Sequence, residues 1–148
     1  PLFGITARGA VIGDPHNADG NLRGFISDGR TTTLFGPADA SWEGYSSARG
    51  VNDRNQVVGE INDSNLGSWA FLYDRGTYTT IEYPQPAPPP HMIGTLLDFG
   101  TQTSPLGINN RGQIVGAWSA SWVTRTSPAR AALWRRNGYF IASPVRPQ

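Results

Sequence analysis

Short apolar segments alternate with turn-forming residues along the whole chain. Residues 56–59 form a short β-branched run, and residues 77–83 alternate between polar and apolar side chains in the manner of a strand. Gly, Pro or Asn interrupts almost every window that could form a helix. No run approaches the roughly 18 apolar residues of a membrane-spanning helix. The pattern predicts an all-β chain of many short strands.

A ten-residue motif occurs three times, beginning and ending with Gly in each copy. Its copies span residues 4–13, 50–59 and 107–116. An arginine stands four residues after the first Gly of each copy, as Arg8, Arg54 and Arg111. The segments Asn52–Asn55 and Asn109–Gly112 suit a type I turn followed by a left-handed residue, a position that Asn and Gly tolerate best. Each copy is therefore predicted to be a hairpin, with its arginine bracing neighbouring repeats.

A second motif follows each copy of the first. It spans residues 24–29, 70–76 and, in a looser form, 131–138. It predicts a second hairpin in each repeat, with turns at Asp28-Gly29, Asp74–Gly76 and Arg136–Gly138. Phe25 and Phe71 are interpreted as core residues between repeats, and Ala132 is interpreted as their lighter counterpart in the third copy.

Together the motifs predict one domain, residues 1–148, of three tandem four-stranded repeats. The repeats span about 4–49, 50–106 and 107–148, with a Pro-rich loop inserted at 84–94. Repeats of this length and strand count are typical of propeller-like blades. Because three blades cannot close, this interpretation predicts a homo-oligomer, most simply a dimer that completes six blades. A β-trefoil, which closes as a monomer, is the alternative.

The two motifs resemble the bacterial extracellular HAF repeat family. The resemblance is strongest at Gly50–Gly59 and Gly107–Gly116, and Ala70–Asp74 is close to the family's His-Ala-Phe-Leu-Trp segment, with Trp69 in place of the His. It covers about two-thirds of the chain and departs from the family in the first repeat and at the Pro-rich insertion. The resemblance implies a secreted or cell-surface, propeller-like array with no generally assigned enzymatic activity.

Composition and charge exclude several classes of function. The chain has no Cys, which excludes disulfides and every Cys-based metal site. Its twelve basic residues, all Arg, oppose eleven acidic ones, for a net charge of +1. This balance argues against a nucleic-acid-binding protein, which would need a clustered basic face.

The residues that could carry catalysis or bind a metal form no local signature. The histidines, His16 and His91, lie in predicted loops, and a hydrolase that uses one of them as a base is the least favoured alternative. The polar loop 14–21 does not fit the register of a calcium loop. We therefore expect no catalytic residues, no metal and no cofactor.

Aromatic residues are the better indication of function. The chain has five Trp, and Trp118 and Trp122 flank a small polar stretch in the third repeat. Tyr73 and Trp134 occupy equivalent positions in the second motif, and Asp74 follows the first of them. Flat rings beside carboxylates and arginines suit sugar recognition. The hypothesis is a non-catalytic module that binds a glycan or a cell surface through Tyr73, Asp74, Trp118, Trp122 and Trp134. A self-assembling structural protein, with these rings buried between subunits, is the alternative.

Overall fold

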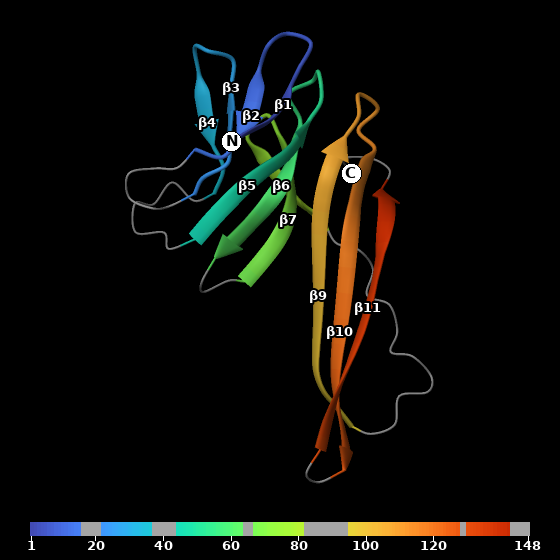
Figure 1. The fold of residues 1–148 in the computed structure, drawn as a ribbon. Coiled ribbons are helices and arrows are strands. Elements are labelled where there is room, and N and C mark those ends of the chain that lie inside the picture. Colours follow the sequence, from blue (N-terminus) through green and yellow to red (C-terminus); the bar gives the residue numbers. More distant parts are fainter. Residues whose placement is uncertain (16–21, 37–43, 64–66, 82–94, 128–129, 143–148) are drawn as a thin grey trace.

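The computed structural model consists of three antiparallel sheets that follow one another along the chain (Figure 1). It describes residues 1–15, 22–36, 44–63, 67–81, 95–127 and 130–142, and in the last sheet it describes the side chains of residues 102–119. Within these ranges there are strands and turns, and no helix that could span a membrane. The prediction of an all-β chain is confirmed.

The first two sheets are up-and-down meanders of four strands. The first has the order β1 (Leu2–Ile5), β2 (Val11–Gly13), β3 (Phe25–Ser27) and β4 (Thr32–Leu34). The second has the order β5 (Gly44–Val51), β6 (Val57–Asp63), β7 (Gly67–Asp74) and β8 (Thr77–Ile81). The third places β10 (Ile114–Ser127) between β9 (Thr95–Ile108) and β11 (Arg130–Ala142), so it has three strands in the described ranges where four were predicted. No described sheet closes into a barrel, as the trefoil alternative would require.

The ten-residue motif forms the turn between the first two strands of each sheet. The N–H groups of Gly9, Asn55 and Gly112 each donate to the carbonyl oxygen three residues earlier. The φ angles of these three residues are 86°, 59° and 77°. This is the predicted type I turn with a left-handed last residue. The sequence interpretation missed a further bond, in which the Asn52 and Asn109 side chains accept backbone N–H groups inside their own turns.

Each sheet also has a β-bulge at the same place, directly before the first Gly of the motif. The pairing of β1 with β2 skips Phe3, that of β5 with β6 skips Arg49, and that of β9 with β10 skips Leu106. A bulge bends the strand and increases its twist. The three hairpins therefore share a bend as well as a turn.

The last Gly of each motif pairs across strands with a phenylalanine: Gly13 with Phe25, Gly59 with Phe71 and Gly116 with Phe140. A Cβ added at Gly13 or Gly59 would lie 3.0 or 2.8 Å from the ring of its partner. The Pro1 and Ser47 carbonyl oxygens would be closer still, so a backbone carbonyl and an aromatic ring together leave no room for a side chain at these two positions.

The prediction for the third copy of the second motif is wrong. Register makes Phe140, and not Ala132, the counterpart of Phe25 and Phe71. Residues 136–138 form no turn, because they lie inside β11 and pair with residues 118–120 of β10. The continuous partner strand satisfies the backbone groups of this Asn-Gly segment, so it stays extended. In Figure 1 the third sheet accordingly extends well past the second.

Side-chain oxygens connect the three turns to one another. The Asp53 carboxylate accepts the Ala7 N–H at 2.7 Å, and the Asp53 N–H donates to Oδ1 of Asn110 at 2.8 Å. Asn110 Nδ2 also donates to the Asp53 carboxylate at 2.6 Å, and Asn52 Nδ2 donates to the Asn109 carbonyl at 3.0 Å. We call these bonds the turn ladder. It links the first sheet to the second and the second to the third.

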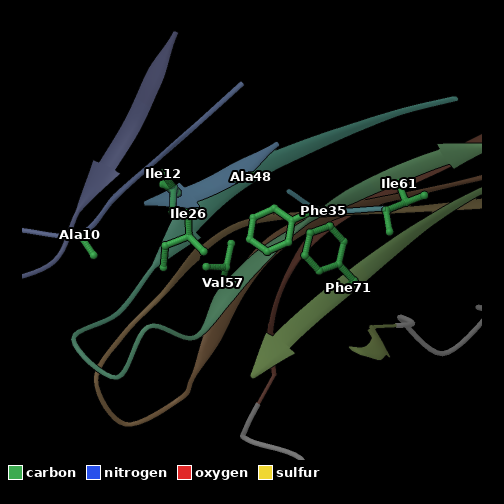
Figure 2. Close-up of a cluster of buried hydrophobic side chains, with 8 residues drawn as sticks. All are labelled: Ala10, Ile12, Ile26, Phe35, Ala48, Val57, Ile61 and Phe71. Atoms are coloured by element: carbon green, nitrogen blue, oxygen red, sulfur yellow. The ribbon is translucent and has the colours of Figure 1, made fainter. Parts of the chain in front are cut away.

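The main apolar core fills the space between the first and second sheets (Figure 2). It consists of Ala10, Ile12, Ile26, Phe35, Ala48, Val57, Ile61 and Phe71. Phe35, which follows β4, is fully buried and stacks at 5.3 Å against Phe71. Burying each of the larger side chains contributes about 1.5–3 kcal/mol. On the other face of β6, Val58 is also fully buried, beside Gly50 where β9 approaches.

Replacing Gly59 by Ala should destabilise the fold by about 1–3 kcal/mol, because the new methyl group would meet the Ser47 carbonyl and the Phe71 ring. Thr80→Ala is the control: Thr80 lies opposite Phe71 on β8 and is exposed, so its loss should stay within about 0.5 kcal/mol. Urea unfolding measures both. Equal stabilities would contradict the close approach at Gly59.

Acid should weaken the turn ladder. The Ala7 N–H, the Asn110 amide and the charge of Arg8 hold the pKa of Asp53 below its ordinary value. A carboxyl group with a lowered folded pKa stabilises the fold fully above roughly pH 4, and this stabilisation is lost as pH falls through the folded pKa. Asp53→Asn removes the titrating group and sets an amide against the Asn110 amide. The variant should have a lower Tm at neutral pH and a smaller fall in Tm on acidification. A parallel shift at every pH would refute this role.

Candidate functional site

A pocket of about 200 Å³ opens between the first and second sheets, near their turns. We call it the intersheet pocket. The first sheet and its turns contribute Ala10, Ile26, Asp28, Thr31 and Thr33, and the second contributes Asn55, Tyr73 and Arg75. It therefore combines apolar atoms, a phenol ring, two threonine hydroxyls, an amide, a carboxylate and a guanidinium group. Such a set offers both apolar contact and hydrogen bonds to one small polar ligand.

Two residues of the intersheet pocket have an unfavourable backbone conformation. Asn55 (φ 59°) and Arg75 (φ 48°) are the non-glycine residues with positive φ in the described part of the chain, and both line this pocket. The left-handed region costs a residue with a side chain up to about 1–2 kcal/mol, less for Asn. Glycine stands at the position equivalent to Asn55 in the other two hairpins, Gly9 and Gly112. Such strain concentrates at functional sites.

Neighbouring aromatic rings hold Tyr73 in place at the pocket. Its ring packs edge-on against Phe35 at 5.2 Å and against Tyr78 at 5.3 Å. Tyr73 is half-buried, whereas Phe35 is fully buried. Burial also raises the pKa of Tyr78, so that phenol stays neutral. The Tyr73 ring is therefore a fixed surface on the wall of the pocket.

The carboxylates beside the pocket are hydrogen-bonded and ionised. Asp28 accepts the N–H groups of Thr31 at 2.7 Å and of Arg30 at 2.9 Å, and these bonds lower its pKa. Asp74 accepts a hydrogen bond from Nε2 of Gln56 at 3.0 Å and forms an ion pair with Nε of Arg75 at 3.1 Å. The Gln56 bond is the largest cause of the lowered pKa of Asp74, followed by the Arg75 contacts. A general acid needs a raised pKa, so neither carboxylate suits that role.

The structure brings some of the predicted ligand residues together and separates others. Tyr73 lines the intersheet pocket, and Asp74 positions Arg75 at its rim. Trp118 lies in the third sheet and is only 9% exposed, so packing accounts for its ring. Register places Trp122 directly opposite Trp134 on neighbouring strands, and their side chains lie outside the described part.

The predicted structural residues also have distinct environments. Phe71 is buried in the core, and Phe25 is half-buried on the outer face of the first sheet. The charge of Arg8 helps to lower the pKa of Asp53, and the charge of Arg54 helps to lower the pKa of Asp74. Arg111 is exposed in its turn, where its N–H donates to Asn109. The bonds between the described turns come from Asp53, Asn52 and Asn110 instead of from these guanidinium groups.

The other candidate sites lie mostly outside the described residues. This holds for His16, His91 and the Pro-rich segment 84–94. Asp14 is described, and its carboxylate accepts the Ala48 N–H at 3.0 Å and the Ser47 hydroxyl at 2.7 Å. It thus joins the first sheet to β5. The residues that the structure describes contain no group of three potential metal ligands.

Sequence reasoning missed Asn55, Arg75, Thr31 and Thr33 as site residues. One signal was present: Asn55 stands where the two other hairpins have Gly. The hydroxyls of Thr31 and Thr33 gave no signal, because the pocket forms only when the two sheets pack together.

Arg75→Gly should raise or preserve stability. Glycine adopts positive φ without strain, and relief of about 1 kcal/mol outweighs the exposed pair with Asp74, which is worth little. Asn55→Gly should have a smaller effect in the same direction. Thermal unfolding of both variants measures this, with Arg111→Ala as a control at an exposed turn residue. A clear loss of stability in Arg75→Gly would show that the side chain is kept for the fold.

Comparison with known proteins gives this chain no relative: no family model matches it, and neither a curated protein nor a solved structure does so.

Proposed function

We propose that the chain is a non-catalytic module that binds carbohydrate in the intersheet pocket. Sugar rings present apolar C–H faces together with several hydroxyls. Tyr73 offers an aromatic wall, while Thr31, Thr33, Asn55 and Arg75 offer donors and acceptors around it. The volume of about 200 Å³ is smaller than the roughly 300–1,000 Å³ of pockets for drug-sized ligands. It suits one sugar ring or the end of a chain.

The strained pair Asn55 and Arg75 carries this proposal. Glycine would relieve the backbone at both positions, yet each has a polar side chain at the same pocket. Both are hairpin-turn positions that need positive φ, and a polar side chain at each, beside the same pocket, supports a ligand contact. Trp122 and Trp134, opposite each other on β10 and β11, remain proposed aromatic contacts of a second region.

The proposal includes the architecture and the location. The three sheets are successive propeller-like repeats, and the chain acts outside the cell, as its resemblance to the HAF repeat family implies. The shared turn, the shared bulge and the recurring Gly–Phe pair support the equivalence of the three units. The lowered pKa values of Asp28 and Asp74 support a binding role over acid catalysis.

A glycan array tests the ligand class, followed by calorimetric titration with the oligosaccharide that gives the strongest signal. Arg75→Gly should weaken binding about 10- to 100-fold, the range expected for losing a hydrogen bond to a charged group, while its stability is preserved. Arg111→Ala should bind as the wild type does.

Two outcomes would contradict the proposal. A wild-type protein that binds nothing on the array excludes the carbohydrate class. Binding that survives Arg75→Gly but disappears in Trp122→Ala or Trp134→Ala moves the site to the third sheet.

A further inference from the structure

The packing of the sheets follows one rule along the chain. We call the face of a sheet toward the preceding sheet its front face, and the opposite one its back face. The second sheet turns Ala48, Val57 and Phe71 forward, where they join the core formed with Ile12 and Ile26 from the back face of the first. Side chains alternate along a strand, and directly opposite residues share a face.

The front face of the first sheet is apolar, and neither of the other two described sheets lies against it. By register, Leu2 is equivalent to Ala48 and Phe25 to Phe71, because each pairs with the last Gly of its motif. Leu2 is 68% exposed, whereas Ala48 is fully buried. On the same face, Ile5 is 69% and Leu34 is 44% exposed. These residues are apolar, as buried residues usually are, but they lie at the surface.

On the back face of the third sheet, a described apolar side chain is exposed in the same way. Val115 is equivalent to Ile12 and Val58, which the following sheet covers completely. Val115 itself is 45% exposed. In Figure 1 the first and third sheets lie on either side of the second.

The first Gly of each motif marks the place where the next sheet is received. A Cβ added at Gly4 would lie 3.3 Å from both Ile12 and Val51, the latter from the next sheet. At Gly50 it would lie 2.8 Å from Gly107, again in the next sheet. At Gly107 the one described atom within 4 Å would belong to Val115, at 3.6 Å. The receiving site on the third sheet therefore has the glycine and the valine, and no described side chain of a following sheet covers them.

We propose that a second copy of this chain docks here, with its Ile5 seated over Gly107 and Val115 as Val51 is seated over Gly4 and Ile12. The occupant is a second copy because the chain itself has the complementary front face. Two such contacts join two copies into one ring of six sheets, within the four to eight blades at which propellers close. The net charge of +1 opposes this association little. The contact does not depend on the proposed carbohydrate pocket.

The contact between copies lacks one bond that both internal contacts have. In the turn ladder, the Ala7 N–H reaches Oδ1 of Asp53, and the Asp53 N–H reaches Oδ1 of Asn110. The next N–H in this series belongs to Asn110, and the residue that would receive it is Ala7 of the second copy, which has no side-chain oxygen. The contact between copies is consequently weaker than the internal ones. Ala7→Asn supplies the missing acceptor and should tighten the association.

Sedimentation velocity over a hundredfold range of concentration tests the proposal. The wild type should reach twice the 16.0 kDa mass of the chain, and Ala7→Asn should do so at lower concentration. Val115→Arg and Ile5→Glu should each remain monomeric. Thr80→Glu, an exposed change on β8 away from both faces, should associate as the wild type does.

Mixing the two monomeric variants gives the decisive result. The mixed pair has one unaltered contact and one contact that sets Arg against Glu, so it should dimerise although neither variant does alone. A wild type that stays monomeric, a mass that grows without limit, or a mixture that stays monomeric would overturn the proposal. Circular dichroism of each variant establishes that it is folded, and binding at the unaltered intersheet pocket is measured separately.

Discussion

Three hairpin turns from three different sheets meet at Asp53, and this residue bonds to the turns on both sides of it. In each step a side-chain oxygen accepts the backbone N–H of the previous turn, and this aligns neighbouring turns. Glycine at Gly4 and Gly50 allows the sheets to approach closely beside them. The bonds at Asp53 are exposed, so the buried side chains of the core supply most of the packing energy between the first two sheets.

The intersheet pocket is a consequence of the same arrangement. Asn55 lies in the same hairpin turn as Asp53. Arg75 pairs with Asp74, and Asp74 accepts a hydrogen bond from Gln56 of that hairpin. The two strained residues are therefore tied to the turn ladder through short chains of hydrogen bonds. The connection is firmer for Asn55 than for Arg75, whose side chain is 87% exposed and whose pair with Asp74 adds little stability.

Local chemistry made the hairpins predictable from the sequence. Asn55, Gly112 and Gly76 stand where positive φ is needed, and short-range bonds decide those turns. The segment at Arg136–Gly138 has the same local chemistry, but pairing along β10 overrides it. The pocket could not be predicted, because Thr33 and Tyr73 approach each other only through the packing of two sheets. Sequence therefore specified the turns well, and the long strands and the site poorly.

The recurring β-bulge places an exposed side chain of different chemistry in each sheet: Phe3, Arg49 and Leu106. The first two meet, because the Arg49 guanidinium lies 5.7 Å from the centroid of the Phe3 ring. Arg49 also pairs with Glu60 at 3.8 Å. The irregularity in one sheet thus supplies a cation–π contact to the next, and a change at either residue alters a contact between the first two sheets.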